Sequence, residues 1–175
     1  MFGRKTLSDK MKNEAVSLGL CAQWTAEWND NSSKDEMVEK FVNGIDFCIA
    51  RDWPSVDVIK KKFGGVIHKH GVYADENIVL RNPSNIVILC GNCNADITLD
   101  GMAACEIYAR HGSVLRLKTN DFARAFVNVL DDATINVESV DESKTFVYQY
   151  GGSIEQCVGN EDIISTVSST KIIKV

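Results

Sequence analysis

The hydrophobic positions of the chain change their spacing near residue 85. Before that point apolar residues recur at steps of three and four, which is the period of an amphipathic helix. After it they alternate with polar residues, which is the period of a half-buried β-strand. The pattern predicts an α+β protein with a helical N-terminal part and a β-rich C-terminal part.

Two helix starts can be located in the first part. Thr6 followed by Asp9, and Ser33 followed by Glu36, have the spacing of a capping box, in which each side chain bonds the backbone of the other residue. The first pair predicts a helix over residues 7–18. The second predicts a longer helix with one apolar face, formed by Met37, Phe41, Ile45, Cys48 and Ile49.

A proline ends this second helix, because Pro54 disfavours helical backbone at the residue before it. Ser55 can then cap a short helix through Phe63. Trp24, Trp28 and Trp53 are expected to fill the core between the helices. We therefore predict a helical module over residues 1–65 and a junction over residues 66–84 that can hold a first strand.

The second part repeats every 20 residues, in rows that begin at 85, 105, 125 and 145. Each row contains strand, two-residue turn, strand and longer turn. One column of the rows holds Val87, Ile107, Val127 and Val147, with Val167 continuing it, and another holds Ile97, Leu117, Val137 and Cys157. Self-similarity at a fixed period is typical of repeat architectures.

Side-chain parity decides between a chain of hairpins and a continuous coil. In a hairpin that turned at Asp131-Asp132, Val127 would share a face with Asn136 while Ile135 lay on the opposite face, so neither face would be apolar. If the two residues instead form a corner, every odd-numbered residue points into one interior. Parity therefore predicts a β-solenoid whose coils stack about 4.8 Å apart through parallel hydrogen bonds.

We predict a short single-stranded β-solenoid over residues 85–175, with about 20 residues per coil and four to five coils. Small residues beside bulky ones suit its narrow interior. The small residues form two expected stacks, Cys105, Ala125 and Thr145 in one, and Cys93, Ser113, Ala133 and Ser153 in the other.

The same parity turns an aromatic patch outward on the first strand of each row. Its expected members are Tyr108, Phe126, Leu130, Phe146, Tyr148 and Tyr150, with Phe126 beside Phe146 and Leu130 beside Tyr150. A contiguous apolar patch of this kind needs a cover. Either the helical module folds over it, or it is a binding surface for a protein partner, in which Tyr and Phe anchors dominate the affinity.

The longer turns form an expected acidic edge from Asp121, Asp141, Glu142, Glu161 and Asp162. Such a ladder can keep a repeat protein soluble, mimic DNA phosphates or collect calcium. Met1 to Ser84 carries 12 Lys and Arg against 12 Asp and Glu, whereas Asn85 to Val175 carries 7 against 12. Direct binding of the β-rich part to nucleic acid is therefore disfavoured.

No motif in the sequence indicates a particular reaction. Cys90 and Cys93 have the spacing of a redox pair or half a zinc site, and Cys105 with His111 could supply two further ligands. However, small thiols at a tight corner explain this motif without reactivity. His68 and His70 would point the same way in an extended chain, so both could bind one ligand or metal, but no carboxylate or cysteine at ligand spacing completes the set. Because the usual enzyme motifs are missing, we predict a protein that is not an enzyme and has no cofactor.

Neither a membrane-spanning apolar run nor a secretory signal is visible, so a cytoplasmic protein with reduced thiols is expected. Ile172, Ile173 and Val175 finish the sequence apolar, so the last coil is expected either to close the solenoid or to pair with a neighbouring molecule.

Three stretches carry a resemblance: GLCAQW (19–24), GIDFCIARDWPS (44–55) and HGVYADE (70–76). With the repeats that follow, they make the chain similar to uncharacterised small repeat proteins of gut anaerobes and their phages. This resemblance implies a phage or mobile-element accessory protein, associated with the virion if phage-encoded, and it implies no activity. The coil length alone resembles that of pentapeptide-repeat proteins, whose pattern fits residues 95–99 once and fails at 100–102.

The expected function is a non-catalytic protein-binding or structural component that uses the outward aromatic face. One alternative is an acidic decoy that inhibits a nucleic-acid-binding enzyme of the host or of a defence system. The other is a thiol or zinc enzyme centred on Cys90 and Cys93.

Overall fold

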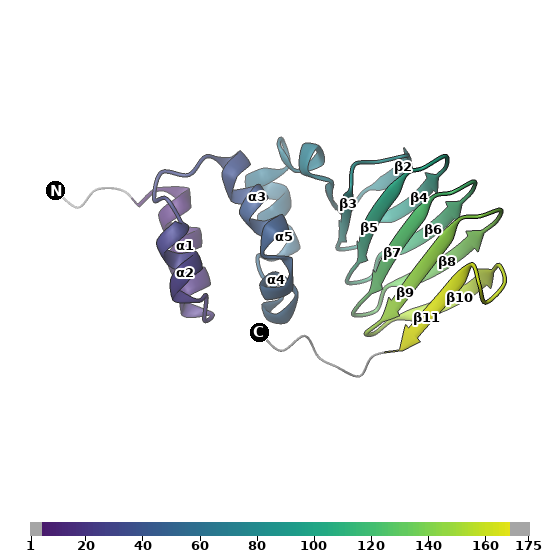
Figure 1. Cartoon of the computed structure of the whole chain (residues 1–175). Helices are drawn as coiled ribbons and strands as arrows, with labels where there is room; N and C mark the ends of the chain where they lie inside the picture. Colours follow the sequence, from purple (N-terminus) through teal and green to yellow (C-terminus); the bar gives the residue numbers. More distant parts are fainter. Residues whose placement is uncertain (1–4, 169–175) are drawn as a thin grey trace. The chain divides into compact units, whose positions relative to one another are not determined.

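The computed structural model describes residues 5–168 (Figure 1). It divides into two compact units, one of helices up to His70 and one of strands from Gly71 onward. Each unit is described by itself.

The first unit contains seven helical segments within residues 5–70. They are α1 (Leu7–Ser17), α2 (Ala22–Glu27), α3 (Lys34–Asn43), α4 (Ile45–Arg51), α5 (Val56–Val58), a π-helical turn (Ile59–Phe63) and a 3-10 turn (Ile67–His70). Both capping boxes form as the sequence predicts: Thr6 with Asp9 opens α1, and Ser33 with Glu36 opens α3. Ser55 caps the short helix that continues to Phe63.

Two features of this unit differ from the prediction. The helix that begins after Ser33 is interrupted at Gly44, which ends α3 and begins α4. A Cβ atom at Gly44 would lie 3.1 Å from the Lys40 carbonyl oxygen, so any other residue would crowd the last turn of α3 at the point where the helix is interrupted. Helix α2 has no start signal in the sequence, because its N-cap residue Cys21 makes no side-chain cap.

The tryptophans behave largely as predicted. Trp28 and Trp53 are buried, with ring centroids 6.5 Å apart, and Phe47 meets Trp53 edge-on at 6.1 Å. The indole nitrogen of Trp28 donates to the Ser8 hydroxyl at 2.9 Å. Trp24 is only half-buried.

The second unit is a β-solenoid of about five turns with about 20 residues per coil, as the sequence predicts. Its strands are β1 (Val72–Ala74), β2 (Asn77–Arg81), β3 (Ile86–Cys90), β4 (Asn94–Leu99), β5 (Ala104–Ala109), β6 (Val114–Thr119), β7 (Arg124–Val129), β8 (Thr134–Ser139), β9 (Lys144–Gln149), β10 (Ser153–Val158) and β11 (Ile164–Ser168). Sheet A has the order β1-β3-β5-β7-β9-β11, and sheet B has the order β2-β4-β6-β8-β10. Figure 1 shows the two sheets facing each other.

Every strand pairing is parallel and joins successive coils. Val127 pairs with Ile107 on one side and with Val147 on the other. The corners are tight turns, in which the amide of Ala133 donates to the carbonyl of Leu130 at 3.0 Å and that of Ser113 to Arg110 at 3.2 Å. Asp131-Asp132 therefore turns the chain from sheet A into sheet B and makes no hairpin within one sheet.

The interior contains the odd-numbered residues that parity assigns to it. Val127, Val129, Ile135 and Val137 are at most 2% exposed. The small residues of the two predicted stacks are equally buried: Cys105, Ala125 and Thr145, and Cys93, Ser113 and Ala133. One apolar cluster runs through all the coils between the sheets.

The corner residues share a left-handed backbone. Their φ angles lie between 46° and 72° at Asp75, Asn82, Gly91, Gly101, His111, Asp121, Asp131 and Asp141. Glycine, aspartate, asparagine and histidine tolerate this region better than other residues do. The recurrence of these residue types at the corners is therefore a requirement of the backbone.

The junction between the modules contains strands. β1 and β2 form a first, shorter coil, in which Val72 pairs with Ile88 and Asn77 pairs with Asn94. The two histidines that precede it lie in the 3-10 turn, so the extended backbone assumed for His68 and His70 is wrong.

The last coil departs from the 20-residue register, which corrects two predictions. Ser153 pairs with Thr134 instead of Ala133 and is exposed, because the corner before it is one residue shorter and a bulge between Ile154 and Gln156 then restores the register. Val167 pairs with Tyr148, so it faces outward, and Thr166 takes the inner position beside Val147. Ile172, Ile173 and Val175, which were expected to close the solenoid or pair with a neighbour, lie outside the described residues.

Candidate binding surface

The six residues of the predicted aromatic patch come from the outer side of sheet A and its corners. We call them the aromatic strip: Tyr108, Phe126, Leu130, Phe146, Tyr148 and Tyr150. Phe126 and Phe146 pair across β7 and β9. Their rings stack with centroids 5.2 Å apart and planes 12° apart. The parallel spacing of the strands fixes this geometry, because residues one coil apart stand directly above each other.

Exposure varies along the strip. Tyr108 and Leu130 are 8% and 5% exposed, whereas Phe126 and Tyr150 are 38% and 37% exposed. Phe146 and Tyr148 are half-buried. The accessible aromatic residues therefore belong to the later coils.

One accessible residue was missed by sequence reasoning. Val167 is 49% exposed and lies beside Tyr148 on the outer face. Val167 leaves the inner column because the turn before β11 is one residue shorter than in the earlier coils. The preceding rows of the repeat do not predict this shorter turn. We call Phe126, Phe146, Tyr148, Tyr150 and Val167 the exposed strip.

Polar side chains lie on the same strands as the aromatic strip. The Glu106 carboxylate accepts from the Tyr108 hydroxyl at 2.8 Å and from the Asn128 side-chain amide at 3.4 Å. Arg124 donates to the carbonyl oxygens of Phe122 and Glu142, at 2.7 and 2.9 Å. The guanidinium of Arg124 therefore ties two coils together at the edge of the strip.

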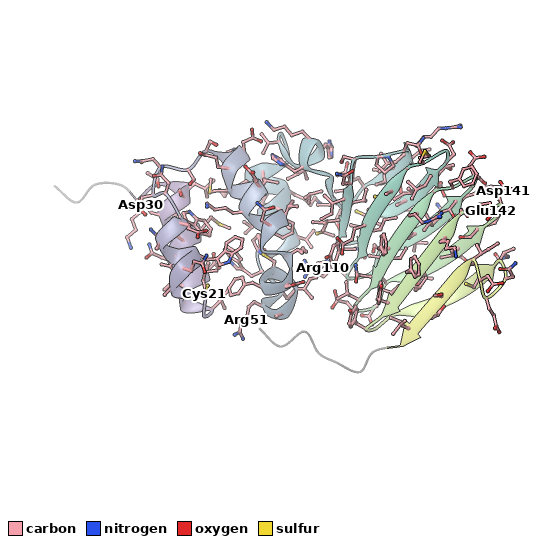
Figure 2. The ribbon with its side chains drawn as sticks, in the orientation of Figure 1. Cys21, Asp30, Arg51, Arg110, Asp141 and Glu142 are labelled. Atoms are coloured by element: carbon pink, nitrogen blue, oxygen red, sulfur yellow. The ribbon has the colours of Figure 1, made fainter. Side chains whose placement is uncertain are left out.

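The acidic edge has a structural role at its centre. The Asp121 carboxylate accepts from the Gly101 amide at 2.9 Å, and the Asp141 carboxylate accepts from the Asp121 amide at 3.3 Å. Asp141 and Glu142 are labelled at their corner in Figure 2. Glu161 and Asp162 lie in the turn before β11 and are exposed. The carboxylates of Asp121 and Asp141 thus bond the corner backbone one coil earlier, which stabilises the stack without any ligand.

At the corners between sheet A and the following strand of sheet B, side chains also accept hydrogen bonds from backbone amides one coil earlier. The Asp131 carboxylate accepts from the His111 amide at 2.9 Å, and His111 Nδ1 accepts from the Gly91 amide at 2.9 Å. Sequence reasoning proposed His111 as a metal ligand, but one of its two ring nitrogens is occupied by this backbone bond.

The cysteines of the weak metal or redox alternative are buried. Cys93 donates from its thiol to the Cys90 carbonyl at 3.2 Å, and Cys105 to the Ser84 carbonyl at 3.4 Å. Burial raises the pKa of Cys93, and it raises the pKa of Cys105 to about 12. A nucleophilic or metal-binding cysteine needs the opposite shift. Within residues 5–168 no three His, Cys, Asp or Glu side chains gather in a group that could hold a metal ion.

One histidine of the 3-10 turn contacts a carboxylate of the same unit. His70 Nε2 lies 2.6 Å from Asp35 Oδ1, and Lys69 bonds the other oxygen of Asp35. The hydrogen bonds from Lys69 and then His70 lower the pKa of Asp35. These contacts tie the 3-10 turn to the start of α3.

The outer face of sheet B is polar and carries a shallow groove of ≈ 290 Å³ across β4, β6, β8 and β10. Arg116 pairs with Asp96, and Lys118 pairs with Glu138 at 3.1 Å. Each of these four side chains is between 45% and 49% exposed, so solvent screens both pairs.

No protein-family model, curated protein or solved structure matches this chain. No helix within residues 5–168 is long and apolar enough to span a bilayer.

Proposed function

We propose that the chain is a non-catalytic protein-binding component, and that the exposed strip is its contact surface. The stacked pair Phe126 and Phe146 carries this proposal, because two phenyl rings on the outer side of one sheet remain partly exposed to solvent. Phenyl rings have no hydrogen bonds to lose on burial, so covering them with an apolar partner surface is favourable.

The composition of the exposed strip favours a protein as the partner. Tyr148 and Tyr150 add rings with a polar hydroxyl beside the two phenylalanines. Aromatic residues of this kind are enriched among the side chains that dominate protein–protein affinity. The parallel strands beneath them are already paired on both sides at β7 and β9, so little conformational entropy would be lost on binding.

We place this activity in the cytoplasm, or in a virion if the chain is phage-encoded, as an accessory protein of a phage or mobile element. The three stretches that resemble small proteins of gut anaerobes and their phages support this origin. The acidic-decoy alternative is less favoured, because the carboxylates of Asp121 and Asp141 bond backbone amides of the neighbouring coils.

The test is a double substitution, Phe126→Asp with Phe146→Asp, compared with Phe122→Asp. Phe122 is 59% exposed but lies at a corner outside the exposed strip, so its substitution is a matched control. A partner captured with the intact chain from its native host is purified, and its affinity is measured by calorimetry. We expect the double variant to bind at least about 30-fold more weakly, and the control to bind as the intact chain does.

Circular dichroism must show that the double variant keeps its β-sheet signal. Equal affinity of the folded double variant would overturn the proposal, and so would equal weakening by Phe122→Asp. Unfolding of the double variant would show that the two rings belong to the core.

A further inference from the structure

The solenoid ends in a step. Sheet A has six strands and sheet B has five, so β11 extends one strand beyond β10. Among the described residues, the outer edges of both β10 and β11 lack a neighbouring strand. The step therefore presents two rows of backbone amides and carbonyls.

The inner surface of the step is also open. Cys157 occupies the inner column beside Val137, yet it is exposed, and Ile154 in the same strand is only half-buried. In the earlier coils the corresponding residues, such as Ile135, are fully buried. The last coil thus has an apolar inner face that another coil would cover.

The two edge strands lack the charges that usually block edge pairing. Residues 153–158 contain one charged residue, Glu155, which sits in the bulge, and residues 164–168 contain none. Natural sheets protect open edges with lysines, prolines and short strands. Lysine and proline are absent from both β10 and β11.

The direction of the strands shows which shape fits this step. The tight corners reverse the chain, so strands of sheet A run opposite to strands of sheet B. A rotation of 180° about an axis parallel to the strands, between the sheets, exchanges the two sheet positions and keeps strand direction. The β11 strand of a rotated copy would then lie beside the outer edge of β10, where no strand of the described residues pairs, and would run antiparallel to it.

We propose that this step binds a second copy of the chain, in a two-fold dimer that joins sheet A of each copy to sheet B of the other. Each copy places β11 beside β10 of its partner, which creates two identical antiparallel junctions. Both inner faces stay inside, because the rotation keeps the interior between the sheets. The arrangement is closed, so it stops at two copies.

One residue can break the junction with little effect on the coil itself. The amide of Thr145 donates to the carbonyl of Ile163, which fixes the alternation along β11. In a parallel ladder the amides of Ser165 and Val167 then face β9, and the amide of Thr166 faces the open edge. Proline is tolerated on an edge strand where the missing amide faces away from the sheet.

The test measures the mass of the full chain by sedimentation at increasing concentration. We expect a reversible monomer–dimer equilibrium. Thr166→Pro should weaken the dimer about 30-fold, because the two-fold axis repeats the lost backbone bond. The control Val79→Pro changes an exposed position on the edge strand at the other end of sheet B, where Val79 is 82% exposed, and it should leave the dimer unchanged. If Thr166→Pro fails to fold, Thr166→Lys is used instead. In the dimer it would place one lysine from each copy at the interior of the interface, so the repulsion between the two charges should weaken the dimer.

The native cysteines supply an independent readout. Cys157 lies at the step and Cys21, labelled in Figure 2, lies in the helical unit, and both are exposed. We expect alkylation of Cys157 to slow as the protein concentration rises, and alkylation of Cys21 to keep its rate.

Four results would overturn the proposal. A monomer at every concentration would do so, as would a dimer that Thr166→Pro leaves intact, because its interface must lie elsewhere. Assemblies that grow beyond two copies would contradict the closed two-fold axis. Cys157 that is unreactive in the monomer would show that the inner face of β10 is already covered.

Discussion

At the scale of single residues, the corners of the solenoid are decided by backbone conformation. Asp131 combines a φ of 53° with a carboxylate that accepts from the His111 amide one coil earlier, at 2.9 Å. A left-handed backbone disfavours most side chains, and an aspartate tolerates it while bonding locally. The acidic character of several corners therefore follows from the turn geometry.

We expect Asp131→Ala to destabilise the protein by about 2 kcal/mol, because it loses the hydrogen bond from the His111 amide and the short polar side chain that lets aspartate tolerate a left-handed backbone. Asp131→Gly keeps the backbone freedom, so it should lose only about 1 kcal/mol. Asp132→Ala is the control, since Asp132 is an exposed neighbour whose φ is not positive. Urea unfolding curves measure all three free energies of unfolding. A loss at Asp132 as large as at Asp131 would contradict the argument.

At the scale of elements, the interior changes character between coils. In the column that begins with Leu99, the later coils bury the hydroxyl side chains of Thr119 and Ser139. In the column that begins with Cys105, the later coils bury Ala125 and then Thr145. Ser139 lies 2.7 Å from both Thr119 and Thr145, and Ser143 lies 3.0 Å from Thr119. All four side chains are at most 1% exposed. These hydroxyls bond one another across three coils, so the apolar column continues as a polar network.

This network predicts opposite effects for two buried serines. Ser139→Ala should lose about 2 kcal/mol of stability, because it removes two buried hydrogen bonds, one to the Thr119 hydroxyl and one to the Thr145 hydroxyl. Ser113 is also fully buried, yet its hydroxyl has no partner within the described part of the chain. Ser113→Ala should therefore be neutral or slightly stabilising. Thermal unfolding of both variants checks the contrast, and equal losses would refute it.

The sequence predicts elements well where one local rule acts alone. Capping boxes located α1 and α3, and parity placed Val127 and Ile135 inside the coil, because each coil repeats the same two corners. Parity fails where an inserted or missing residue changes the register between neighbouring strands. The bulge at Glu155 and the short turn before β11 are single-residue changes, and a fixed period of 20 cannot foresee them.

The candidate site was predictable only in part for the same reason. The stacking of Phe126 on Phe146 follows from the 20-residue spacing of the rows. Val167 joined the exposed strip only through the shifted register of β11. Tyr108 and Leu130 are buried whereas Tyr150 is exposed, and this difference has no signature in the rows.

At the scale of the whole molecule, the solenoid unit has its own core. Within residues 5–168, the continuous apolar cluster and the half-buried residues packed against it all lie between Tyr73 and Ile164. In a solenoid each coil contacts mainly its neighbours, so stability is a sum of coil and interface terms. A unit with this organisation does not need a distant segment to complete its interior.

We therefore expect a fragment that spans residues 71–175 to fold without the helical unit. It should keep a β-sheet circular dichroism spectrum and unfold cooperatively in urea. A matched fragment that also lacks the first coil, spanning residues 85–175, exposes the β3 and β4 edges that β1 and β2 cover, so it should be less stable by several kcal/mol. An unfolded 71–175 fragment would show that the two units fold only together. If the fragment folds but aggregates in light scattering, while the full chain does not, the helical module would be the cover that the exposed strip needs, which would contradict the role of that strip as a binding surface.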